Sequence, residues 1–340
     1  MINKEQIAKE TEAIIKKGKE LAKEKGREVV FLGQSREKEA EFLDINDFRN
    51  GYVSGRTGSG KSCSLISFIK INNQINPDSK WFFADGKSGG DFNIIGGYSD
   101  LPVAEKVARG NGSQNLSKLL TYVFEIYLDR QELFKKAREN GKPVRNIFEY
   151  REHVGPLPRI WICIDEIRAF LGETDFDDSI AEVNSISNMI VRLLAEARSF
   201  GFTFIFSCQQ YTSTNVPTII RSNTPTKIFH GTNPQDALYA QLNTTLDFTI
   251  LEKGEFFLIN LDTNLCNITK PMNTPFLAGK DSLYGNSLNG KLPKVTFEEI
   301  ESFIEEEYKH LQEKYPDVIP KEDEYAERRR LKHLHELLKK

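Results

Sequence analysis

The sequence predicts an α/β fold in which a mostly parallel sheet is flanked by helices. Apolar segments of strand length alternate with segments whose apolar residues recur at helical spacing. This alternation is typical of parallel sheets that are covered on both faces. In addition, residues 55–62 are a full match to the phosphate-loop pattern GxxxxGK[ST], and they lie between one such strand and one such helix.

The phosphate loop is the best-defined functional signal. Glycines let its backbone N–H groups turn inward toward phosphate oxygens, and the positive end of the following helix adds to the attraction. We expect Lys61 to reach the β- and γ-phosphates and the Ser62 hydroxyl to occupy one Mg²⁺ position, which predicts ATP and Mg²⁺ as ligands. The candidate nucleotide-binding residues are Gly55, Arg56, Thr57, Gly58, Ser59, Gly60, Lys61, Ser62 and Cys63.

The other elements follow in chain order. Strands are expected at residues 28–33, 52–54, 81–85, 160–164, 202–207, 227–230 and 255–260. Helices are expected at residues 1–25, after the phosphate loop, at 114–139, at 180–197 (with Asp177 and Ser179 as N-cap candidates), and twice after about residue 297. We divide the chain into a charged N-terminal helix (1–27), an ATPase domain (28–290) and a charged helical tail (291–340).

Composition narrows the class of protein. With 340 residues and a formal net charge of −3, any bound DNA must be held by local basic patches. The longest apolar runs are far shorter than the ~20 residues that a bilayer requires, and the N-terminus has no apolar signal-peptide core. The four cysteines are far apart and form no CxxC pair, so neither a zinc site nor a disulfide scaffold is indicated. We expect a cytoplasmic protein with reduced thiols.

The strand at 160–164 supplies the second half of an ATPase site, because Asp165 and Glu166 follow it directly. Ligand sites in open parallel sheets gather at the carboxyl ends of strands. We expect Asp165 to hold Mg²⁺ and Glu166 to orient and deprotonate the attacking water. The alternative is an acidic strand end with no catalytic role. The strand at 81–85 also ends in an acid, Asp85, but it lacks the adjacent glutamate, so we expect Asp85 either to have a structural role or to support the residues that contact the ligand.

A polar side chain also follows the strand at 202–207. The amide of Gln209 could sense whether a γ-phosphate is present. Capping of nearby backbone groups is an equally open interpretation.

Further segments resemble motifs that occur together, and in this order, in one family of proteins. The segment 81–87 (WFFADGK) resembles a strand that ends in Asp-Pro-Lys, with Gly86 in place of proline, and 157–167 is similar to a Walker B segment. Residues 194–201 resemble a Gly-Arg-Ala-x-Gly turn, and 207–210 stand where Ala-Thr-Gln-Arg is usual. Residues 221–228 resemble Lys-Ala-Asn-Ile-Pro-Thr-Arg-Ile, and 254–257 resemble Gly-Asp-Met-Leu. Together they resemble the motor domain of the FtsK/SpoIIIE/HerA group of hexameric double-stranded DNA translocases, over about residues 50–260.

The resemblance implies a RecA-like ATPase that assembles as a homo-hexameric ring around double-stranded DNA, with each ATP site at a subunit boundary. It implies that Arg198 is an arginine finger, a catalytic side chain that reaches the γ-phosphate bound by the neighbouring subunit. Without the resemblance, Arg198 is a cation that satisfies a helix end. Arg221 and Lys227 match basic positions near the DNA channel, and their alternative is ordinary solvated charge.

Two substitutions and two missing parts separate this sequence from the chromosome translocases. Gln210 replaces an arginine, which puts one DNA contact in doubt, and Ala197 replaces a glycine. We find neither the membrane segments nor the C-terminal winged helix. The sequence is more similar to the compact FtsK-type ATPases of conjugative plasmids and integrated mobile elements. That similarity implies a coupling protein for DNA transfer, with a relaxase or a membrane-anchored secretion component as partner.

Two hypotheses from different classes remain at this point. In the first, ATP hydrolysis drives translocation along double-stranded DNA, which Asp165 and Glu166 favour. In the second, the protein is a nucleotide-switched adaptor that recruits DNA or a relaxosome to a secretion machine without processive movement, which the modest net charge and the charged ends favour. DNA-stimulated ATPase activity separates the two.

Overall fold

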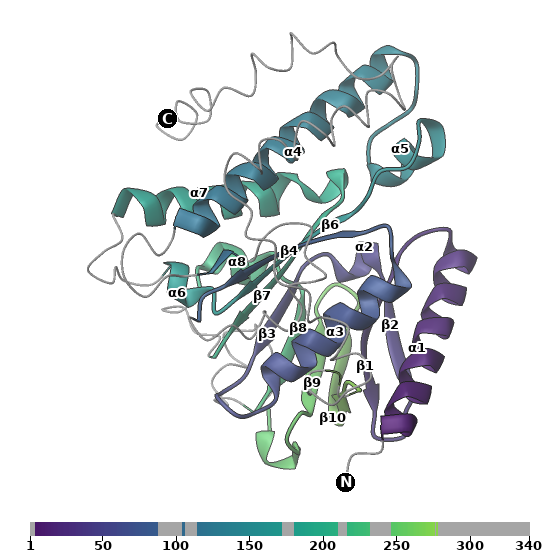
Figure 1. The fold of residues 1–340 in the computed structure, drawn as a ribbon, viewed down its shortest axis with the longest axis vertical. Helices are drawn as coiled ribbons and strands as arrows, with labels where there is room; N and C mark the ends of the chain where they lie inside the picture. The colour runs from purple at the N-terminus through teal and green to yellow at the C-terminus, as the bar shows by residue number, and fades with distance from the viewer. Residues whose placement is uncertain are drawn as a thin grey trace.

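A ten-stranded sheet organises the chain, and helices cover both of its faces (Figure 1). The structure is a computed structural model that describes residues 4–87, 104–105, 114–171, 180–209, 216–231, 246–275 and 277. The strand order is β2-β1-β10-β9-β8-β3-β7-β6-β4-β5. The run from β8 to β5 is parallel, whereas β2, β1, β10 and β9 pair antiparallel with their neighbours. The predicted α/β class with a mostly parallel sheet is confirmed.

All of the predicted strands are present, and β2, β5 and β10 are additional. The strands are β1 Val29–Ser35, β2 Ala40–Asp44, β3 Gly51–Ser54, β4 Lys80–Asp85, β5 Ala104–Glu105, β6 Ile160–Asp165, β7 Phe202–Cys208, β8 Thr226–His230, β9 Phe256–Asn260 and β10 Leu265–Asn273. Strand β10 escapes prediction because it contains Pro271, which has no N–H to donate to a sheet. The pairing of β10 with β9 shifts register between Asn267 and Met272, and such an irregularity accommodates a proline.

Where the structure describes them, the predicted helices are present, and α2, α5, α6 and α8 are additional. They are α1 Lys4–Lys25, α2 Ile45–Phe48, α3 Lys61–Ile75, α4 Gln114–Glu139, α5 Ile147–His153, α6 Arg168–Leu171, α7 Ile180–Glu196 and α8 Thr218–Ser222, with 3₁₀ turns at Arg198–Phe200 and Phe248–Ile250. The N-cap candidates Asp177 and Ser179 and the charged tail at 291–340 lie outside the described residues. The division of the chain into three parts stays a prediction.

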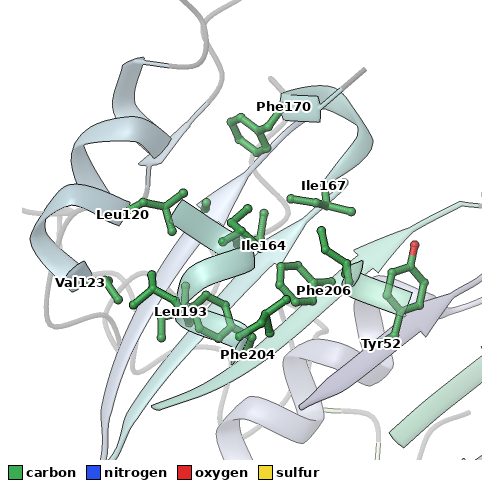
Figure 2. Close-up of a cluster of buried hydrophobic side chains, with 14 of the residues drawn as sticks. Tyr52, Leu120, Val123, Ile164, Ile167, Phe170, Leu193, Phe204 and Phe206 are labelled. Atoms are coloured by element: carbon green, nitrogen blue, oxygen red, sulfur yellow. The ribbon is translucent and has the colours of Figure 1, made fainter. Parts of the chain in front are cut away.

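Side chains alternate between two apolar layers, one on each face of the sheet. On β4, Trp81 and Phe83 pack in the layer that contains α3, whereas Phe82 and Ala84 pack in the layer that contains α4 and α7. Figure 2 shows part of the second layer, where side chains of β6 and β7 lie against Leu120, Val123 and Leu193 of these helices. Strands that are buried on both faces need apolar residues at every position, which explains the continuous apolar runs in the sequence.

The N-terminal helix packs on the helix that carries the phosphate loop. Ile14 and Ile15 of α1 are buried in one cluster with Ile71 and Ile75 of α3. The same cluster contains Val29 and Phe31 of β1, so α1 lies beside α3 and also packs directly on the sheet (Figure 1). Across the described ranges, no helix is long and apolar enough to cross a membrane.

Candidate active site

The ends of five neighbouring parallel strands meet at one edge of the sheet, which we call the carboxyl edge. Register pairs Ser54 of β3 with Cys208 of β7 and with Phe229 of β8, and pairs Asp85 of β4 with Asp165 of β6. The phosphate loop leaves β3 at this edge. Residues that are far apart in the sequence are therefore brought around the loop, as expected for a ligand site in a parallel sheet.

The phosphate loop is fixed from both sides. The N–H of Gly55 donates to the carbonyl of Cys208 at 3.3 Å, and the N–H of Gly254, which precedes β9, donates to the carbonyl of Ser59 at 2.9 Å. Gly60 has φ of 101°, and a Cβ at this position would lie 2.6 Å from the Cα of Gly254. Only glycine fits both conditions, so the tight turn into α3 depends on it.

The predicted nucleotide-binding residues divide into an exposed rim and a more buried base. Arg56, Thr57 and Gly58 are exposed, whereas Ser62 and Cys63 in the first turn of α3 are half-buried. The rim is thus open to a ligand from solvent, and the Ser62 hydroxyl stands at the start of the helix where a phosphate-bound cation would need it.

Lys61 and Asp165 form a buried ion pair at the base of the loop. The Lys61 ammonium donates to Asp165 Oδ1 at 3.1 Å and to Ser207 Oγ at 2.9 Å, and the Ser207 hydroxyl donates to Asp165. Burial raises the pKa of Asp165, but Lys61, Lys87 and the Ser207 hydrogen bond outweigh that effect and lower it to about 2. The carboxylate is therefore ionised at neutral pH.

A second cation on Asp165 was missed from the sequence. The Lys87 ammonium lies 3.2 Å from Asp165 Oδ2, and the Lys87 N–H donates to Asp85 Oδ1 at 2.8 Å. A Cβ on Gly86 would lie 2.7 Å from the carbonyl oxygen of Glu166, so this turn approaches β6 closely. Asp85 therefore shapes the turn that delivers Lys87. The available signal was the similarity of residues 81–87 to a strand ending in Asp-Pro-Lys.

Glu166 is held in an unusual backbone conformation beside this ion pair. Its φ is 49°, a left-handed value that is uncommon for residues other than glycine and that recurs at functional sites. Its Oε1 accepts a hydrogen bond from the Cys208 thiol at 3.3 Å. Its Oε2 is buried, and among the described residues it has no hydrogen-bond partner. One carboxylate oxygen is thus available to accept a proton.

Gln209 directly follows β7 and is exposed. Because β7 lies between β3 and β6, its end stands between the phosphate loop and Asp165. This location agrees with the predicted sensor role, which stays a prediction.

Arg198 lies at the opposite, amino edge of the sheet, in the 3₁₀ turn before β7. Its guanidinium donates to the carbonyl of Asn46 at 2.9 Å. Burial and the neighbouring Arg49 lower its pKa. It borders a cleft of about 930 Å³ that is also lined by the four arginines Arg27, Arg49, Arg151 and Arg159. From this edge Arg198 cannot reach the phosphate loop of its own chain, so a finger role requires a second chain.

The two predicted DNA-binding residues also lie at the amino edge, in different environments. Lys227 is 1% exposed, its ammonium donates to the carbonyl of Thr224 at 2.6 Å, and burial lowers its pKa to about 8. Arg221 is half-buried on α8 and donates to the Thr218 hydroxyl at 2.9 Å. Contact between Lys227 and DNA would require its buried hydrogen bond to break, whereas Arg221 is the more accessible cation.

The residues present fit Mg²⁺ with ATP. Within the described ranges, no three His, Cys, Asp or Glu side chains form a dedicated metal site. Mg²⁺ is typically bound through one or two carboxylates together with substrate phosphates and water. The ionised carboxylate of Asp165 and the Ser62 hydroxyl are a donor set of this kind.

No family model matches the chain. Over 245 residues, 68% of its length, the chain is 23% identical to DNA translocase FtsK of Streptococcus pneumoniae and 25% identical to that of Halalkalibacterium halodurans. The sequence resembles the FtsK-type DNA translocases. It spans 30% and 28% of the length of these two relatives.

Solved structures share the fold. The pCW3 conjugation coupling protein TcpA, described with ATPγS, has a TM-score of 0.58 and 21% identity, over 76% of this chain and 69% of TcpA. The cytoplasmic domain of the type VII secretion ATPase EccC from Thermomonospora curvata has a TM-score of 0.57 and 17% identity, over 78% of this chain and 31% of EccC. The predicted RecA-like P-loop fold is confirmed.

Proposed function

We propose that this protein hydrolyses ATP to move along double-stranded DNA. The observation that carries the proposal is the joint position of Lys61, Asp165 and Glu166 at the carboxyl edge of the sheet. There a phosphate-binding cation, a Mg²⁺ ligand and a proton acceptor stand side by side, which is the set that phosphoryl transfer to water needs. The FtsK-type relatives are named as DNA translocases, which supports DNA as the substrate of movement.

Each residue has a defined task in this proposal. Ser62 and Asp165 would hold Mg²⁺, which neutralises phosphate charge when bound. The Lys61 ammonium binds the β- and γ-phosphates, leaving Lys87 to neutralise Asp165 from the other side. Glu166 orients the attacking water and takes its proton on the unpaired Oε2. Gln209 responds to the presence of the γ-phosphate.

The amino edge supports an assembly of several subunits. Arg198 lies too far from its own phosphate loop to act there, so we propose that it stabilises the transition state in a neighbouring subunit of a hexameric ring. Arg221 lies at the same edge and is our proposed contact to DNA phosphates. Contacts of this kind position the duplex without reading its sequence, as a motor requires.

We further propose a role in conjugative DNA transfer. TcpA, which shares the fold, is named as a conjugation coupling protein. A coupling protein would work in the cytoplasm with a relaxase or with a membrane-anchored secretion component.

The test combines three measurements on one preparation. Steady-state ATP hydrolysis is measured with and without linear duplex DNA, mass is measured by light scattering, and movement is followed by displacement of a third strand from the duplex. The motor predicts stimulated hydrolysis, a ring-sized particle and displacement that Glu166→Gln abolishes. Nucleotide-dependent DNA binding without stimulation or displacement would instead identify the adaptor.

A further inference from the structure

His230, the last residue of β8, is fully buried beside the phosphate loop. A Cβ placed on Gly55 would lie 2.7 Å from the His230 Cβ, so the two residues are in direct contact. On its other side, the imidazole ring centroid is 5.2 Å from that of Phe256. Across the described ranges, neither ring nitrogen of His230 has a hydrogen-bond partner.

The Ser59 hydroxyl shares both features. Its oxygen is buried and, within the part of the chain that the structure describes, has no hydrogen-bond partner. It lies 2.6 Å from the same Cβ position on Gly55. Two polar side chains without partners therefore flank one glycine of the loop. A buried polar group left unpaired costs free energy, so its persistence indicates a second state in which it is satisfied.

The imidazole is electrically neutral in this setting. Burial and the nearby Lys61 ammonium lower the pKa of His230 to about 3. The backbone of Glu255 has a smaller effect in the opposite direction, and it does not form a hydrogen bond with the imidazole. A neutral imidazole has one donor nitrogen and one acceptor nitrogen, so it can pair with a hydroxyl in either direction. It does so without placing a second positive charge beside Lys61.

The end of β8 is already tied to the loop through the backbone. The Arg56 N–H donates to the carbonyl of Gly231, the residue after His230, at 3.2 Å. A small rearrangement of the loop would thus bring the Ser59 hydroxyl to the His230 imidazole while this backbone hydrogen bond to the end of β8 stays in place.

We infer that His230 is a positioning residue for the phosphate loop, and that its imidazole hydrogen-bonds the Ser59 hydroxyl when the loop closes around a nucleoside triphosphate. The inference rests on the proposed function, because it assumes that the loop binds nucleotide. It predicts that one substitution of His230 has opposite effects on the nucleotide-free and the nucleotide-bound protein. Removing the unpaired nitrogens relieves a cost in the nucleotide-free protein, whereas the bound form loses a hydrogen bond.

The experiment measures two quantities, the melting temperature of the nucleotide-free protein and the affinity for Mg²⁺-ATPγS by calorimetry. His230→Leu should melt at the same temperature as wild type or higher, and should bind about fivefold to tenfold more weakly, as expected for one hydrogen bond. Ser59→Ala should weaken binding similarly, and the double variant should bind no more weakly than the worse single one. His230→Asn, which keeps a polar donor and acceptor, should recover part of the affinity.

The matched control is His153→Leu on α5, at the amino edge, which should change neither quantity. The inference is overturned if His230→Leu binds with wild-type affinity, if it melts lower, or if the two single losses multiply in the double variant. A wild-type protein that fails to bind ATPγS would instead overturn the proposed function, so the two failures are distinguishable.

Discussion

Replacing Lys61 with methionine should destabilise the nucleotide-free protein as well as abolish nucleotide binding. Lys61 is the nearer of the two cations on a carboxylate that is 1% exposed. The pKa of Asp165 falls from an ordinary 3.8 to about 2, and one unit corresponds to about 1.4 kcal/mol, so its charged form is stabilised by roughly 2 kcal/mol. Without Lys61, burial of the charge is opposed only by Lys87 and Ser207, and most of this stabilisation should be lost.

The loss has a definite size and pH dependence. For a chain of 340 residues, a loss of about 2 kcal/mol corresponds to a melting temperature lower by roughly 3 °C. Because the pKa of Asp165 is depressed in the folded state, its contribution is fully present above its ordinary pKa and disappears as the pH falls toward 2. The difference between wild type and variant should therefore be constant near neutral pH and should shrink below about pH 4.

Calorimetric melting at pH 7 without nucleotide is the assay. Lys87→Met should have a smaller effect, because the Lys87 side chain is 31% exposed and its charge is screened. Asp165→Asn in the Lys61→Met background should restore stability, since it removes the unbalanced charge, and the exposed Arg168→Met serves as control. If Lys61→Met has the melting temperature of wild type, or if adding Asp165→Asn does not raise the melting temperature of Lys61→Met, the buried ion pair does not have the energetic role assigned to it.

The remaining predictions concern turnover, assembly and DNA. Glu166→Gln should keep ATP binding and lose at least about a hundredfold in hydrolysis, because an amide cannot accept the proton of water; turnover at the wild-type rate would remove Glu166 from the mechanism. Arg198→Ala should bind ATP but hydrolyse it poorly, and mixing it with Glu166→Gln should restore some activity; no rescue in confirmed mixed rings would argue against a shared site. Arg221→Ala should weaken binding of unrelated duplexes equally and should reduce the slope of log K against log salt concentration by about one. Because Lys227 is buried, Lys227→Ala should change this slope less. A salt titration in which Lys227→Ala changes the slope more than Arg221→Ala would contradict the assignment.

The sequence alone determined the phosphate loop and the strand that ends at Asp165, because both are local patterns. A strand, a glycine-containing turn and a helix start are encoded by consecutive residues, so Lys61 and Ser62 could be proposed as phosphate and Mg²⁺ ligands without the fold. The pair Asp165-Glu166 was recognisable for the same reason, as it ends the most apolar strand. Continuous apolar runs also fixed the α/β class, since only strands that are covered on both faces need them.

The tertiary structure decided which other residues surround the loop. Lys87 follows β4, Ser207 lies in β7 and His230 ends β8, and they gather around the phosphate loop and Asp165 only because β8, β3, β7, β6 and β4 are neighbours in the sheet. Strand order depends on the summed packing of both faces, and no short segment encodes it. Burial is decided in the same way. Lys227 is a basic residue in the sequence but is 1% exposed in the fold, because its strand lies between β3 and β9 with its ammonium held by a backbone carbonyl.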